Sequence, residues 1–91
     1  SPALDIIKLL NQENINFVYN DPMVSSIEIE GQTYKSQNID DDLLQNTNLG
    51  LITTDHSLYD WKYLTNNLNY IFDTRNALRN ISKSKAKIFK L

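Results

Sequence analysis

The spacing of apolar residues near the start of the chain predicts an amphipathic helix. Apolar side chains recur at three- and four-residue spacing from Leu4 to Leu10, so one stripe of this helix is expected to pack on a sheet. Ser1-Pro2 is a helix-start signal, because serine caps a helix and proline at the first helical position needs no amide donor. Residues 11–14 are expected to end the helix.

Two β-prone stretches follow this helix. Residues 17–19 (Phe-Val-Tyr) form a short apolar run, which the turn-favouring sequence at 20–22 ends, and we predict a strand there. Residues 26–30 then alternate apolar and acidic side chains, and Gly31-Gln32 separates them from a second β-prone run at 33–35. This pattern predicts an antiparallel hairpin that leaves the main sheet.

The second half of the chain alternates helical and β-prone patterns. In order, we predict a short helix that starts at the acidic residues 40–42, a buried strand over 49–53, a helix over 57–67 capped by Ser57, a strand over 68–72, a helix turn over 77–79 and a final short strand at 88–89.

This order of elements predicts an α/β fold. Alternating strands and helices with one hairpin imply a layered structure around a mainly parallel sheet. Ninety-one residues are enough for one domain, which would span residues 1–91. Because such a sheet usually begins with a strand and this chain opens on a helix, we expect the first strand to be missing and the chain to be truncated.

Composition excludes several classes of site and setting. The chain has no cysteine, which excludes a cysteine nucleophile and a thiolate zinc site, and its single histidine is too few for a histidine-rich metal site. No stretch approaches the roughly 20 apolar residues of a membrane span, and no secretory signal is visible. These features fit a soluble protein in the cytoplasm.

Charge is distributed unevenly. The net charge is -2, yet residues 1–74 hold all eleven acids and three lysines, whereas residues 75–91 hold six bases and no acid. A basic tail can contact phosphates, but the acidity of the whole chain argues against a nucleic-acid-binding surface.

Three polar clusters follow the predicted strands directly, at residues 20–21, 54–56 and 73–76. Ligands of parallel sheets bind beyond the carboxyl ends of the strands, so we expect the three clusters to meet at one edge. Arg75 is the sharpest candidate, because a guanidinium makes paired hydrogen bonds to phosphates and carboxylates. The alternative is that Arg75 only fastens the loop by pairing with Asp73 or Asp55, and both roles are compatible.

The other candidates have plain structural explanations. Histidine is the usual side chain for acid–base chemistry near neutral pH, which makes His56 a possible acid or base, although a lone histidine more often caps a turn. Asp55 and Asp73 are a possible carboxylate pair, but aspartates after strands usually cap loops. The only glycines are Gly31 and Gly50, so the chain contains neither a G-x-G-x-x-G fingerprint nor a P-loop, and a cofactor pyrophosphate would have to bind elsewhere.

Four phrases in order resemble the UDP-glucose/GDP-mannose dehydrogenase family, carboxy-terminal UDP-binding domain. The resemblance covers roughly residues 1–78, with a fainter match at 87–91, and is greatest to the branch that acts on UDP-N-acetylmannosamine or UDP-N-acetylglucosamine. The phrases are Ser1-Pro2-Ala3, Tyr19-Asn20-Asp21-Pro22, Thr53-Thr54-Asp55-His56-Ser57 and Phe72-Asp73-Thr74-Arg75-Asn76-Ala77.

The resemblance implies a Rossmann-like three-layer sandwich and a three-part parent enzyme. Its amino-terminal domain would bind NAD, and its central domain would carry the catalytic cysteine and form a homodimer or higher oligomer. Such an enzyme is a UDP-sugar 6-dehydrogenase that oxidises the sugar to a uronic acid for surface polysaccharide. The resemblance assigns Arg75 to UDP contact, with Asp73 and Asn76 orienting its loop and Asp55 and His56 as supporting residues.

The chain also departs from the family pattern. The G-x-x-x-K strand and the R-E pair expected before Ser1 are absent, and Asn14 stands where glycine is expected, although asparagine also enters the left-handed region. We therefore expect no catalytic residue within these 91 residues and no activity of the chain alone. The alternatives are a stand-alone flavodoxin-like module that binds a nucleotide, anion or protein, and a phosphoacceptor centred on Asp55.

Overall fold

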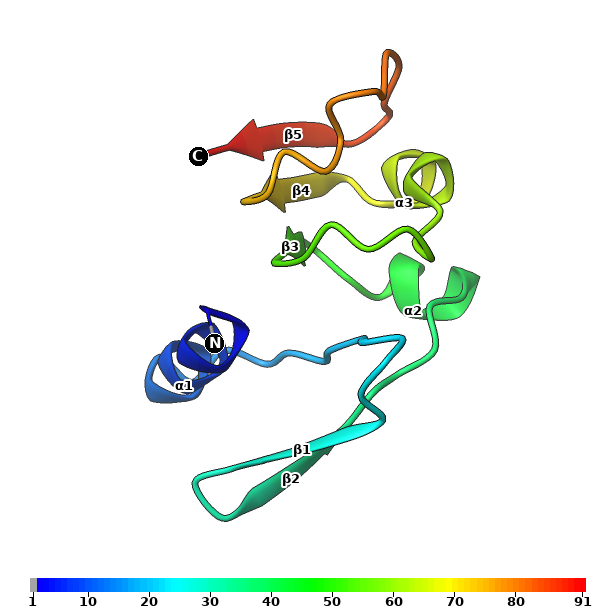
Figure 1. Cartoon of the computed structure of the whole chain (residues 1–91). Helices are drawn as coiled ribbons and strands as arrows, with labels where there is room; N and C mark the ends of the chain where they lie inside the picture. The colour runs from blue at the N-terminus through cyan, green and yellow to red at the C-terminus, as the bar shows by residue number, and fades with distance from the viewer. Residues whose placement is uncertain (1) are drawn as a thin grey trace. The chain divides into compact units, whose positions relative to one another are not determined.

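The computed structural model describes residues 2–91, apart from the side chain of Pro2, so the predicted Ser1 cap lies outside the described residues. The chain divides into two compact units, residues 1–38 and 39–91. Figure 1 labels the elements. They are α1 (Pro2–Gln12), β1 (Ser26–Ile29), β2 (Gln32–Lys35), α2 (Asp41–Gln45), β3 (Gly50–Ile52), α3 (Trp61–Asn67), β4 (Tyr70–Asp73) and β5 (Lys87–Lys90).

The first helix forms and ends as predicted. Beyond α1, Asn14 takes a left-handed backbone conformation with φ 55°. The amide of Asn14 then donates to the Asn11 carbonyl (3.1 Å), and the amide of Ile15 donates to the Leu10 carbonyl (3.0 Å). This pair of bonds is a Schellman motif, which satisfies carbonyls that the helix end leaves open. Asparagine thus supports the left-handed turn that ends the helix.

The predicted hairpin is also confirmed. Strands β1 and β2 pair antiparallel, with Ile29 opposite Gln32. The two residues between them, Glu30 and Gly31, both have positive φ, at 51° and 81°. A two-residue turn of this kind matches the right-handed twist of the strands, and glycine adopts it without strain.

The predicted strand over residues 17–19 is wrong. The run carries no strand pairing within residues 2–91, and the Tyr19 carbonyl accepts a single backbone bond from the Gln37 amide (2.8 Å). Phe17 contributes to packing instead, since the centroid of its ring lies 5.3 Å from that of the Tyr34 ring. A strand requires a ladder of bonds to a neighbour, and β propensity alone does not supply one.

The second unit has the predicted parallel α/β architecture. Its sheet has the order β3-β4-β5, and both neighbouring pairs are parallel (Figure 1). Ile71, in the central strand β4, is 1% exposed and lies in one apolar cluster with residues of α2, α3 and the segment between β4 and β5. The buried members of the cluster are Leu44, Ile52, Leu64, Leu68, Ile71, Ala77, Leu78 and Ala86.

Helix starts in this unit follow capping chemistry, with one correction. The acidic start of α2 is confirmed, and Asp40 caps it by accepting from the Leu43 amide (2.8 Å). The predicted Ser57 cap is wrong, because α3 begins at Trp61 and Asp60 accepts from the Tyr63 amide (3.1 Å). Leu58, assigned to the helix stripe from its spacing, is 67% exposed in the preceding turn.

The predicted helix turn at 77–79 is a hydrogen-bonded turn instead of a helix. The Ile81 amide donates to the Leu78 carbonyl (3.0 Å), and the chain then runs without regular structure to β5. Within the described residues, no helix has the length and apolar character needed to cross a membrane.

Candidate functional site at the carboxyl ends of β3 and β4

The loops that follow β3 and β4 are joined at the carboxyl edge of the parallel sheet. Thr74, the first residue after β4, donates from Oγ1 to the Ile52 carbonyl at the end of β3 (2.6 Å). The Thr74 amide lies 3.2 Å from the same carbonyl oxygen. The polar clusters at 54–56 and 73–76 therefore start from one edge of the sheet, as the parallel order predicts.

Asp73 fixes the shape of the loop after β4. Its side chain is 1% exposed, and its carboxylate accepts from the amides of Arg75 (3.0 Å), Ala77 (3.0 Å) and Leu78 (2.9 Å). Burial by itself raises the pKa of the Asp73 carboxyl, but these amides, together with Lys90, outweigh burial and hold the pKa below its ordinary value of 3.8. The Asp73 carboxylate is thus hydrogen-bonded within its own loop.

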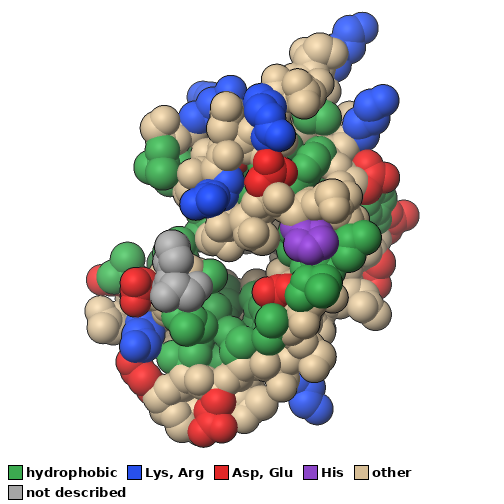
Figure 2. All heavy atoms as spheres, in the orientation of Figure 1, with side chains coloured by type: hydrophobic (Ala, Val, Ile, Leu, Met, Phe, Trp, Pro, Cys, Tyr) green, Lys and Arg blue, Asp and Glu red, His purple; other side chains and the backbone are tan. Residues whose placement is uncertain are grey.

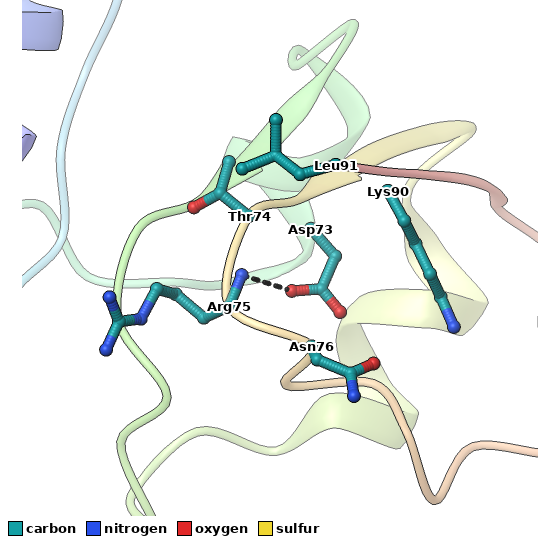
Figure 3. Close-up of a pocket in the computed structure, with 6 residues that line it drawn as sticks. All are labelled: Asp73, Thr74, Arg75, Asn76, Lys90 and Leu91. Carbon is teal, nitrogen blue, oxygen red and sulfur yellow. Dashed lines mark hydrogen bonds between the residues drawn. The ribbon is translucent and has the colours of Figure 1, made fainter.

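The backbone of Arg75 is fixed by a hydrogen bond, whereas its side chain is not. Its amide donates to Asp73, while its guanidinium makes no hydrogen bond or ion pair within residues 2–91. The side chain is exposed and points away from the Asp73 carboxylate (Figure 3). It borders an open pocket of about 580 Å³ that is also lined by Asp73, Thr74, Asn76, Lys90 and Leu91.

Asp55 is joined to the loop after β4 by Arg79, a residue that sequence reasoning missed. Arg79 Nη1 lies 2.7 Å from Asp55 Oδ2 and also donates to the Asn76 carbonyl (3.0 Å). Asn76 itself has a positive φ of 56°, which reverses the chain and brings Arg79 back toward β3. The loop fastener considered for Arg75 is therefore Arg79. The sequence signal that could have identified Arg79 was its position in the basic segment that follows the D-T-R-N phrase.

His56 closes the turn after the cluster at 54–56. Its Nδ1 accepts from the Leu58 amide (3.1 Å), and its ring lies edge-on to that of Tyr59, with centroids 6.3 Å apart. As a hydrogen-bond acceptor, the Nδ1 of His56 closes the turn at residues 56–58. This arrangement is the turn cap that was weighed against acid or base chemistry.

The third predicted cluster belongs to the other compact unit. There, Asp21 Oδ1 accepts from the amides of Met23 (2.8 Å) and Val24 (3.2 Å), and Asn20 donates to the Gln37 carbonyl (2.7 Å). Both side chains thus organise the approach to the hairpin.

Lys90 is a second cation at the pocket that sequence reasoning did not single out. It is the register partner of Asp73 in the parallel pair β4-β5 and lines the same pocket as Arg75. Lys and Arg side chains gather over the second unit (Figure 2), and all six bases of residues 75–91 are exposed. In the described part of the chain, no group of acidic or histidine side chains is arranged to hold a metal ion.

Comparison with known protein families gives one match. Residues 1–80 match the UDP binding domain of the UDP-glucose/GDP-mannose dehydrogenase family. The matched residues include both loops at the carboxyl edge of the sheet and stop before β5. Searches of the curated proteins and of the solved structures each returned no match.

Proposed function

Because the chain belongs to the UDP-glucose/GDP-mannose dehydrogenase family and matches its UDP binding domain, we propose that it binds the UDP of a nucleotide-sugar substrate through Arg75. The parent enzyme in this proposal is an NAD-dependent UDP-sugar 6-dehydrogenase. The observation that carries the proposal is the state of Arg75, whose backbone is fixed by Asp73 while its guanidinium remains exposed and unpaired within residues 2–91.

The geometry of the loop supports this role. A buried carboxylate that accepts from three amides fixes the backbone of the loop at residues 75–78, so the backbone position of Arg75 is set before a ligand arrives. Preorganisation reduces the entropy lost on binding. The guanidinium itself provides donors that match a phosphate or the planar edge of uracil.

NAD binding does not fit the described residues. A pyrophosphate cradle of the dinucleotide type needs a glycine-rich turn at the start of a helix. The two glycines of this chain lie in the hairpin turn, at Gly31, and within β3, at Gly50. In our proposal NAD is therefore held by another part of the parent enzyme, and none of these residues takes part in hydride transfer.

We further propose that residues 1–91 are one part of a longer enzyme whose sheet continues beyond β3. In residues 2–91 this strand pairs only with β4, and its Leu51 side chain is 38% exposed. A free strand edge offers unpaired amides and carbonyls to a neighbouring strand. A further parallel strand at this edge would extend the sheet that carries the binding loops.

For the substrate, we propose a UDP-N-acetylhexosamine that is oxidised at C6 to the uronic acid, in a cytoplasmic enzyme of surface polysaccharide synthesis. The T-D-H phrase at 54–56 and the D-T-R-N phrase at 73–76 support this branch of the family. Comparing kcat/KM for UDP-N-acetylglucosamine, UDP-N-acetylmannosamine and UDP-glucose, each with NAD, would test the choice. Preference for UDP-glucose would contradict it.

The binding role is tested by Arg75→Ala in the full-length protein. Loss of a charge-assisted hydrogen bond should weaken UDP binding, and raise KM for the UDP-sugar, by roughly 1.5 to 3 kcal/mol. Arg75→Lys keeps the charge but not the planar fork, so it should recover only part of the loss. An unchanged UDP affinity in Arg75→Ala would refute the assignment. Equal affinity for UDP and pyrophosphate would favour a general anion-binding module.

A further inference from the structure

We propose that Lys90 is a second ligand-binding residue of this pocket and contacts the diphosphate of the bound nucleotide beside Arg75. The inference rests on the proposed UDP-binding function. It concerns a residue outside the segment 1–80 that matches the family, so it is drawn from the geometry of the sheet.

The topology places Lys90 at the binding edge. Strands β4 and β5 are parallel and pair Asp73 with Lys90, so both strands end at the same side of the sheet. Paired residues of neighbouring strands direct their side chains to the same face. Lys90 therefore lies on the face of Asp73, and the two residues line one pocket together with Arg75.

Neither cation of the pocket is neutralised by a direct partner. Within residues 2–91, the Lys90 ammonium forms no hydrogen bond or ion pair, and the same holds for the Arg75 guanidinium. The acid between them, Asp73, is 1% exposed and has its carboxylate occupied by three backbone amides. In Figure 3 the two cationic side chains lie on opposite sides of that carboxylate.

These charges favour a polyanionic ligand. A single carboxylate would meet one cation well, whereas a diphosphate carries its charge on two linked groups and gains from a second cation. The alternative is that Lys90 only balances the buried charge of Asp73, since it contributes to the lowered pKa of that group. A structural role of this kind would act on stability, whereas a ligand contact would act on affinity and on its salt dependence.

Lys87 provides a matched control on the same strand. It lies at the other end of β5, and its Nζ sits 5.2 Å from the centre of the Phe89 ring. Alternation along the strand directs it to the face opposite Lys90. Lys87→Gln therefore removes the same charge from β5 without touching the pocket.

The experiment titrates UDP into the full-length protein at several salt concentrations, for wild type, Lys90→Gln, Lys90→Arg, Lys87→Gln and Arg75→Ala. An exposed charge contact predicts that Lys90→Gln raises the UDP Kd roughly two- to fivefold and flattens its salt dependence. Lys90→Arg should restore both quantities, and Lys87→Gln should behave as wild type. Thermal midpoints, measured without ligand, report any change in folding.

Several outcomes would overturn the proposal. These are an unchanged Kd in Lys90→Gln, an equal loss in Lys87→Gln, or a lowered thermal midpoint with an unchanged salt dependence. Loss in Lys90→Gln together with an unaffected Arg75→Ala would support Lys90 and refute the Arg75 assignment. Failure of the wild type to bind UDP would refute the proposed function and this inference with it.

Discussion

Arg79 and Asp55 join the loops that follow two neighbouring strands. Their side chains meet at 2.7 Å although 24 positions separate them in sequence, and the same Arg79 nitrogen donates to the Asn76 carbonyl at 3.0 Å. Asn76 is the residue whose positive φ turns the chain after Arg75. The ion pair thus connects the turn next to the proposed ligand contact with the loop after β3.

Breaking this pair should loosen the binding loop without unfolding the protein. The side chains are 52% and 33% exposed, so the coupling energy is expected to be small, about 0.2 to 1 kcal/mol. Arg79→Gln and Asp55→Asn should each weaken UDP binding by roughly twofold, and the double variant should be no worse than either single variant. Calorimetric titration of the full-length variants measures all three affinities.

The reversed pair Asp55→Arg/Arg79→Asp is the control for this prediction. It restores opposite charges and should recover part of the affinity lost in the single variants. Strictly additive losses in the double variant Arg79→Gln/Asp55→Asn would mean that the two side chains act separately and would contradict the prediction.

Asp73 makes stability depend on acidic pH. Its folded-state pKa lies below 3.8, so the folded protein binds this proton less readily than the unfolded chain. The resulting stabilisation is fully present above the unfolded pKa and is lost as pH falls through the lower folded value. The free energy of unfolding should therefore decrease as the solution is acidified below about pH 4, measured by urea unfolding along a pH series.

Asp73→Asn tests the origin of that pH dependence. Both carboxylate oxygens of Asp73 accept from backbone amides, whereas the asparagine side chain has only one acceptor oxygen and its NH2 group cannot accept. The variant should therefore lose roughly 2 to 3 kcal/mol of stability at neutral pH. It should also show a flatter stability curve in acid. Asp42→Asn, which removes an exposed acid of α2, is the matched control and should change little. An acid dependence in Asp73→Asn equal to that of wild type would assign the effect to other carboxyls.

The sequence predicted elements whose determinants are local and missed those that depend on distant partners. Patterns among neighbouring residues predicted α1, the hairpin, and the order of β3, α3 and β4. Each of these elements is present in the structure. Residues 17–19 also have a high β propensity, but they pair with no neighbouring strand within the described chain. A strand is completed only by its partner, which propensity does not encode.

The candidate site shows the same division. Placing Arg75 after a parallel strand was enough to bring it to the carboxyl edge. Which arginine meets Asp55 depended on the left-handed turn at Asn76, and a linear reading had no means to choose between Arg75 and Arg79. The start of α3 was predicted at Ser57, whereas Asp60 caps the helix, and serine and aspartate are both preferred at this position.

The hairpin turn offers a test of backbone strain that is independent of ligand. Glu30 adopts φ 51°, a left-handed conformation that is costly for a side chain of its type and readily taken by asparagine. Glu30→Asn should therefore stabilise the folded chain by about 0.5 to 1 kcal/mol, measured as the free energy of unfolding in urea. Glu28→Gln is the control, because it removes an equal charge from the exposed side of β1 without altering the turn. Equal stabilisation by both variants would show that relief of acidic repulsion, and not the backbone conformation of residue 30, is responsible.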